Sequence, residues 1–186
     1  MKSNFTTTRL LKLTLFCLLF FSVQIGNINA QTICVAPDIP IAPAAEVQTF
    51  DDFTGAGFAL DIVSTPGALC SDAFSIDGFG DNVAFGETVT TGDPARGITT
   101  EDVSTGGIYA LDRMGGDFAL WIQPGGSDFT PGMITYRLVN NTGNTIQDLM
   151  VSYDILSFND QDRSNSFNFS HSADNSTYID LSLIHI

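Results

Sequence analysis

The chain has 186 residues, 44% of them hydrophobic, and 21 acidic against seven basic side chains give it a formal charge of −14. So acidic a surface repels nucleic-acid phosphates and anionic membranes unless a bound cation intervenes. We therefore expect neither a nucleic-acid-binding protein nor one that adsorbs to anionic lipid.

Residues 1–30 have the pattern of a secretory signal peptide. Basic residues precede the apolar run Leu13–Val23, and a small-residue site ends at Ala30. The run is shorter than the roughly 18 residues that cross a bilayer, which disfavours a membrane anchor. The sequence predicts cleavage after Ala30 and a secreted, extracellular or cell-surface location, with no membrane span.

The mature chain keeps four arginines against all 21 acids, which leaves a charge of −17 and enough residues for one domain with a core. Its two cysteines are Cys34 and Cys70, and an oxidising compartment favours a disulfide between them. In the chain-entropy model that bond stabilises the fold by about 3–4 kcal/mol. Two unrelated buried thiols are the alternative.

Residues 31–45 hold three of the seven prolines and are typical of an extended lead-in. From Glu46 onward, short apolar or alternating runs are separated by turn residues, and apolar spacing typical of a helix is absent from the sequence. The predicted strands are Val47–Phe53, Gly57–Val63, Ala73–Phe79, Val83–Phe85, Gly107–Leu111, Phe118–Ile122, Met133–Asn140, Thr145–Phe158, Ser164–Ser172 and Thr177–Leu181.

So many short strands between turns indicate an all-β fold, and we expect a jelly-roll-like two-sheet antiparallel sandwich over residues 46–180. Gly115 and Gly116 predict a hairpin turn within Asp112–Asp117. In Ser164–Ser172, strict alternation places Phe167, Phe169 and His171 on the inward face.

The last six residues, Leu181–Ile186, match the in-frame translation of CTGTCTCTTATACACATC, a transposon end used to fragment sequencing libraries. We interpret 181–186 as a scar derived from a sequencing adapter, to be excluded from functional reasoning. The native sequence is then expected to end near Asp180 within a domain that continues further. A genuine apolar strand end is the alternative.

The densest polar cluster is the loop Asn159–Asn165. Asp160 and Asp162 could supply oxygen ligands to Ca²⁺, but the loop lacks the sixth-position glycine and twelfth-position glutamate of an EF-hand. A turn rich in Asp and Asn, with Arg163 paired to a neighbouring acid, explains the same residues. Apart from this Ca²⁺ interpretation, no cofactor is expected.

The sequence shows no catalytic constellation. Asp51 and Asp52 are adjacent, so in a strand their carboxylates would point to opposite faces and could not work as a pair. Nucleophile elbows, P-loops and dinucleotide fingerprints are missing from the sequence, and His171 is the one histidine outside the 181–186 stretch. We therefore expect no enzymatic activity from these residues.

Trp121 is the single tryptophan. In a strand it alternates away from Leu120 and Ile122, which leaves two interpretations open: an outward platform for stacking on sugar rings, or a core side chain. We name it as the candidate ligand-binding face.

Four stretches carry a resemblance to a known class of protein: Thr91–Gly97, Thr105–Asp112, Arg137–Ile155 and Asn159–Tyr178. Together they resemble an N-terminal β-sandwich module of large secreted proteins from bacteria that use type IX secretion. The resemblance covers most of residues 46–180. It implies further domains downstream in the same polypeptide, and it carries no catalytic motif.

Three functions follow as hypotheses. The first is a non-catalytic secreted or cell-surface β-sandwich module for adhesion or for glycan or protein binding within a longer protein. The second is an accessory domain of an extracellular hydrolase, nuclease or glycan-active, whose catalytic part lies elsewhere. The third is a self-contained glycan hydrolase, which would need two carboxylates about 5–10 Å apart in a cleft.

Overall fold

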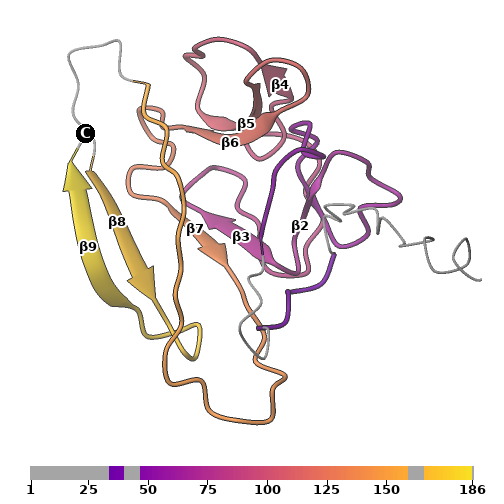
Figure 1. Cartoon of the computed structure of the whole chain (residues 1–186). Coiled ribbons are helices and arrows are strands. Elements are labelled where there is room, and N and C mark those ends of the chain that lie inside the picture. The colour runs from indigo at the N-terminus through magenta and orange to yellow at the C-terminus, as the bar shows by residue number, and fades with distance from the viewer. Residues whose placement is uncertain (1–33, 40–46, 159–165, 186) are drawn as a thin grey trace, which may run out of the picture. The chain divides into compact units, whose positions relative to one another are not determined.

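The computed structural model describes residues 34–39, 47–158 and 166–185, with only the backbone given for 182–185. The predicted signal peptide lies outside the described residues. The described part contains strands and no helix, so the predicted all-β class is confirmed (Figure 1). Its strands are β1 (Phe58–Ala59), β2 (Leu69–Cys70), β3 (Phe74–Asp77), β4 (Ile98–Thr99), β5 (Gly107–Asp112), β6 (Phe118–Gln123), β7 (Met133–Tyr136), β8 (Ser166–His171) and β9 (Ile179–His185).

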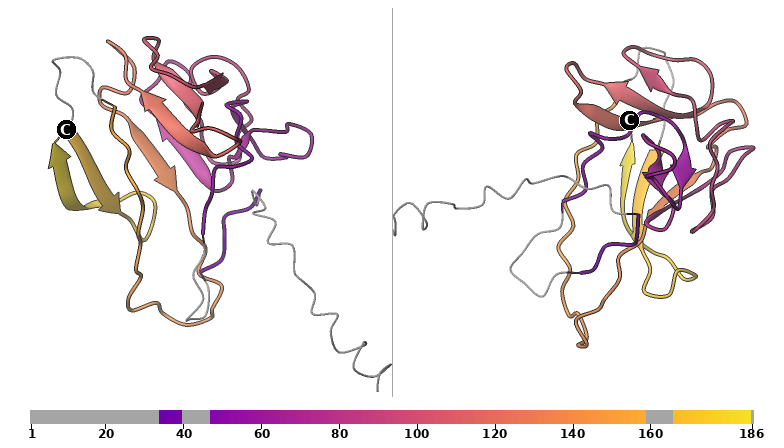
Figure 2. Two further views of the ribbon diagram at one scale, coloured as in Figure 1. Left: turned by 45° about the horizontal axis from the view of Figure 1, so that its top comes forward. Right: turned by 90° about the vertical axis from the view of Figure 1, so that its right-hand side faces the viewer.

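The strands form four small sheets. β1 pairs with β2 in parallel, β3 with β7 antiparallel, and β8 with β9 antiparallel, while β5 lies between β4 and β6. Figure 2 shows β8 and β9 as a hairpin of their own. The two continuous sheets of a jelly roll are not formed by the described strands, so that finer architecture stays a prediction.

The β5–β6 hairpin is the element that the sequence predicts best. Its register pairs Tyr109 with Trp121 and Asp112 with Phe118. In the turn, Gly115 and Gly116 have φ of +81° and +88°, the left-handed conformation that glycine adopts without steric cost. The hairpin and its turn are confirmed.

Three predicted strands are wrong. Val83–Phe85 forms only an isolated bridge, between Val83 and Ile76. Val47–Phe53 forms no strand, because a turn at Asp51 and Asp52 brings Phe53 into the core, with the Phe53 amide donating to the Phe50 carbonyl at 2.9 Å. Thr145–Phe158 also forms no strand, and no described strand or isolated bridge pairs with it. Apolar alternation in these last two stretches is therefore not accompanied by pairing with a described strand.

The core lies in the first half of the described chain. Phe53, Phe58, Leu69, Ile76 and Ile108 are almost fully buried and form one cluster with their neighbours. Among the described side chains, none after Ala110 is buried to this degree. The second half therefore contributes far less apolar burial than its composition would allow.

Arg137, which follows β7, contacts Asp72 and Phe85 in the first half of the chain. Its Nη2 lies 2.5 Å from Asp72 Oδ1, and its guanidinium lies 4.3 Å above the Phe85 ring. Asp72 Oδ2 accepts a hydrogen bond from the Ala36 amide at 3.1 Å, and the Val139 amide donates to Pro37 O at 2.8 Å. Residues 34–39 of the lead-in are thereby held beside the end of β7.

We expect Arg137→Met to lower the free energy of unfolding by about 1 kcal/mol, because the change removes a half-exposed ion pair and a cation–π contact. Arg113→Met is the matched control. Arg113 pairs with Asp117 at 2.6 Å in the exposed β5–β6 turn, and its loss should cost under about 0.5 kcal/mol. Urea unfolding of both variants measures the difference, and equal costs would contradict the role given to Arg137.

Candidate functional site

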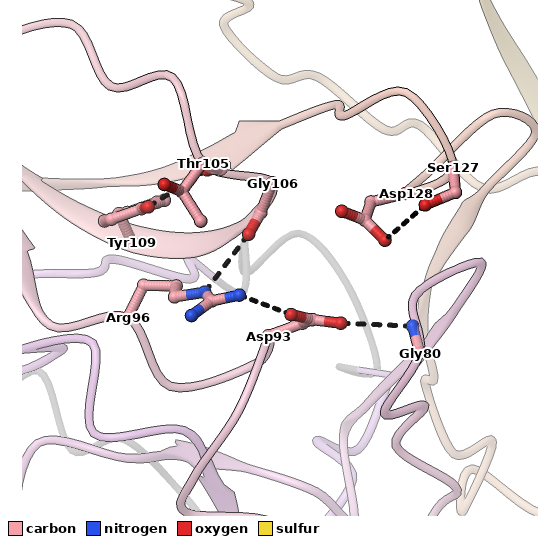
Figure 3. A network of polar contacts seen from close by, with 8 residues as sticks. All are labelled: Gly80, Asp93, Arg96, Thr105, Gly106, Tyr109, Ser127 and Asp128. Atoms are coloured by element: carbon pink, nitrogen blue, oxygen red, sulfur yellow. Dashed lines mark hydrogen bonds and ion pairs between the residues drawn. The ribbon is translucent and has the colours of Figure 1, made fainter.

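A polar network joins three loops beside β5 (Figure 3). Arg96 Nη2 lies 2.5 Å from Asp93 Oδ1, and Arg96 Nε donates to the Gly106 carbonyl at 3.1 Å. The other carboxylate oxygen of Asp93 accepts the Gly80 amide at 3.1 Å. Asp93 and Arg96 lie in the stretch Thr91–Gly97. Because both oxygens of Asp93 are used in holding loops together, the network is a structural brace and not a free acid–base pair.

The other candidate acids do not gather into a site. Asp51 and Asp52 lie exposed in a turn and not in the strand expected for them. Among the described residues, no group of three or more His, Cys, Asp or Glu side chains could hold a metal ion. Asp160 and Asp162 lie outside the described residues, so the Ca²⁺ interpretation stays a prediction, and thermal unfolding with and without a chelator tests it.

Trp121 lies in β6, and its side chain is half-buried. Its indole N–H donates to Gln123 Oε1 at 3.3 Å, and the Phe158 ring lies 6.1 Å from the indole, centroid to centroid. An aromatic side chain from another segment therefore lies against it. This contact links Trp121 to residues 147–158 and makes it less suitable as an open platform for a sugar ring.

Residues 147–158 expose more large apolar side chains than any other described segment of similar length. Met150 is 95% exposed, Leu156 62% and Phe158 61%. We call the full set the apolar strip: Leu149, Met150, Val151, Tyr153, Ile155, Leu156 and Phe158. Figure 1 draws this segment as a trace without an arrow, in keeping with its lack of strand pairing.

Aromatic contacts hold the apolar strip at two points. Phe158 lies against Trp121 of β6, and the Tyr153 ring stacks on Phe169 of β8 with centroids 5.1 Å apart. The backbone between these points is not paired with any described strand. Apolar side chains with an unpaired, strand-like backbone are the features that recruit a further β-strand.

The sequence of this segment has apolar residues on both faces, a pattern that predicts a strand but does not say what pairs with it. Leu149, Val151, Tyr153 and Ile155 share one face, but the opposite face carries Met150 as well as Leu156 and Phe158. A strand that is apolar on both faces is typical of one covered on both sides. The described part of the chain supplies only a small share of that cover.

β8 shows where the predicted faces fail. Phe167 and Phe169 are half-buried, as alternation predicts, but His171 is exposed, so the prediction that it faces inward is wrong. The pairing with β9 shifts between Phe169 and Ser170, and an irregularity of this kind breaks the two-residue alternation. His171 is therefore a surface residue, and none of the described hydrogen bonds joins its imidazole to a carboxylate.

Asp174 organises the turn between β8 and β9. Its Oδ1 accepts the amides of Thr177 at 2.8 Å and Ser176 at 2.9 Å, and the Ser172 hydroxyl at 3.0 Å. The Thr177 amide first, then the Ser176 amide and the Ser172 hydroxyl, hold the pKa of Asp174 well below its usual range. The charged form is the one that these donors stabilise.

Because the folded-state pKa of Asp174 is depressed, its contribution to the turn is present above pH 3.8 and is lost as pH falls through the folded value. We expect the Asp174 carboxylate to remain ionised at about pH 3, where an unperturbed aspartate is mostly protonated. Carboxyl-carbon NMR shifts measured against pH check this. A midpoint for Asp174 near 3.8 would contradict the described turn.

Cys34 and Cys70 are free thiols in the structure and are not at disulfide distance, so the predicted bond is not formed in it. The Cys34 thiol instead contacts the carbonyl oxygens of Ala59 (3.2 Å) and Leu60. Cys70 is buried beside it. Burial first, and then the neighbouring Cys34 thiol, raise the pKa of Cys70 to about 12.

Comparison with known proteins finds no match: no family model, no curated protein and no solved structure is similar to this chain at a significant level. Within the described residues, no helix has the length and apolar character needed to cross a membrane. Function therefore has to be argued from the apolar strip and its surroundings.

Proposed function

We propose that this chain is a non-catalytic, secreted binding module that recognises an extended segment of a partner protein by adding it as a β-strand along residues 147–158. The observation that carries the proposal is the apolar strip, where an alternating segment is exposed and pairs with no described strand. An added strand would pair the backbone of this segment and cover its exposed apolar side chains. Main-chain hydrogen bonds would give affinity and alternating side chains specificity.

The charges near the apolar strip favour a basic partner. Residues 141–158 contain Asp148 and Asp154 and no lysine or arginine. A second copy of this chain is disfavoured, because each copy without residues 1–30 carries a formal charge of −17 and the two would repel. The proposed ligand is thus an extended segment with apolar residues at alternate positions and lysine or arginine at its flanks.

The predicted sandwich belongs to the same proposal. A partner strand beside 147–158 would give this segment the sheet pairing that it lacks among the described strands, and we propose the jelly-roll-like sandwich as the architecture of the complete domain. The resemblance to N-terminal modules of type IX-secreted proteins supports an extracellular setting, and on the same basis we propose that the chain is part of a longer protein. Secretion through the signal peptide in residues 1–30 is part of the proposal.

Titration with synthetic peptides tests the proposal. The probe alternates valine and threonine over seven residues between lysine flanks, and Trp121 fluorescence reports binding because the single tryptophan lies against Phe158. We expect saturable binding that weakens with salt. A peptide that differs only by a proline in place of its central residue, and so lacks a backbone N–H for the strand pairing, should not bind.

Val151→Lys supplies the matched variant. It places a charge in the apolar strip, and we expect at least a ten-fold loss of peptide affinity with little change in stability, because Val151 is exposed. Val63→Lys makes the same change at a residue that is 86% exposed in another loop, and it should bind as the unmodified chain does. No binding of the lysine-flanked peptide, or equal loss in both variants, would overturn the proposal.

A further inference from the structure

We infer that Cys34 and Cys70 form an ordered dithiol oxidation site, in which Cys34 reacts first with an external disulfide and Cys70 then closes the internal bond. The closed bond would clasp residues 34–39 to the core. This inference is independent of the apolar strip and of the proposed function.

The geometry brings the two cysteines together through β1 and β2. Cys34 Sγ donates to the Ala59 carbonyl at 3.2 Å, and Ala59 is the register partner of Cys70 in the parallel β1–β2 pair. Cys34 also packs against the core cluster to which Cys70 belongs. Two residues 36 positions apart in sequence are therefore neighbours in the fold.

The two thiols differ in access. Cys34 is only partly buried, whereas Cys70 is 1% exposed and its pKa is raised to about 12, chiefly by burial. An oxidant from solution needs an accessible thiolate to attack it, so it meets Cys34 first. Cys70 can react only with a sulfur already held beside it, which is what a mixed disulfide on Cys34 provides.

The reaction with an external disulfide such as oxidised glutathione balances in two steps. The Cys34 thiolate attacks one glutathione sulfur, the glutathione S–S bond breaks, and one glutathione thiolate leaves and takes up a proton. Cys70 then loses its proton to water, its sulfur attacks Cys34 Sγ, and the second glutathione leaves as a thiol. Two protein thiols are oxidised to one disulfide, and the oxidant is reduced to two thiols.

The bond would act on a segment that is already in contact with the rest of the fold. Ala36 donates to Asp72, and Asp38 forms a bridge with Val139 near the end of β7. A covalent link between Cys34 and Cys70, 36 positions apart in sequence, would restrict the unfolded chain and keep residues 34–39 beside these partners. We expect oxidation to raise the unfolding temperature by about 10 °C, from the loop-closure entropy of the unfolded chain.

The test uses the full chain with Cys17→Ser in every variant, so that only the two cysteines of interest remain. After incubation with oxidised glutathione and alkylation, intact mass should show the loss of two hydrogens in the parent. Cys70→Ser should trap one glutathione on Cys34, at least about ten-fold faster than Cys34→Ser acquires one on Cys70. Trp121 fluorescence confirms that each variant is folded.

Peptide mapping needs a protease that cuts beside acidic residues, because no lysine or arginine lies between Cys34 and Cys70. Three results would overturn the inference: no internal bond in the parent, equal reaction rates in the two folded single-cysteine variants, or a bond that leaves the unfolding temperature unchanged.

Discussion

Replacing Phe58 by alanine is expected to destabilise the chain by about 3–5 kcal/mol, whereas the same replacement of Phe158 should cost less than about 1 kcal/mol. Phe58 is fully buried in the core cluster, and its removal leaves a cavity as well as losing apolar burial. Phe158 is 61% exposed and has one described ring contact, to Trp121. Urea unfolding of the two variants measures both values.

The difference between the two variants tests whether the buried core lies in the first half of the described chain. The two variants delete the same atoms, so differences in unfolded-state properties largely cancel. Similar losses from both sites would mean that the second half of the chain is packed as tightly as the first, and that the apolar strip is not free to bind.

The second large effect is expected for Gly57→Ala, which should lower the free energy of unfolding by about 3 kcal/mol or more. Gly57 has φ of +91°, which strains any residue with a side chain. A Cβ at this position would also meet backbone atoms, with Thr90 Cα only 2.9 Å away and the Val89 carbonyl oxygen closer still. The backbone must then shift at the point where Phe58 exchanges hydrogen bonds with Val89.

Gly115→Ala is the control that measures how much stability is lost from the positive φ alone, without a steric clash. Gly115 also has a positive φ, but a Cβ there would meet nothing within 4 Å. We expect a loss of about 1–2 kcal/mol from the left-handed conformation alone. If both variants lose the same amount, the close approach of β1 to the Val89 segment is not as described.

Local signals explain what sequence reasoning recovers. The β5–β6 hairpin combines two alternating runs with glycines that fit its turn, and β3, β7, β8 and β9 each appear within a predicted strand or overlapping one. All of this information lies within a few residues in sequence. The all-β class follows from the same short-range patterns.

Long-range pairing explains what is missed. β2 and β4 have two residues each, too few to show an alternation, and they exist as strands only because β1 and β5 lie beside them. The brace between Asp93 and Arg96 likewise depends on Gly80 and Gly106, which are distant in sequence. No local pattern contains these partners.

The sequence predicts the candidate site only in outline. It indicates Trp121 as a ligand-binding face, but the ring contact that Trp121 makes comes from Phe158, in a segment whose pattern predicts a paired strand. The alternation in Thr145–Phe158 correctly indicates a segment suited to a sheet. The pattern does not say whether the sheet is completed within the chain or by a partner.

Amide hydrogen exchange of residues 147–158 tests the central claim most directly, because it reads backbone pairing residue by residue. In the chain alone, these amides should exchange far faster than those of Ile108 and Ala110 in β5, which donate to the Asp93 and Gly97 carbonyls at 2.8 and 3.0 Å. Saturation with the lysine-flanked peptide should slow them at least ten-fold. Amides in 147–158 that are already as protected as those of β5, or that stay fast with the peptide bound, would contradict strand addition at the apolar strip.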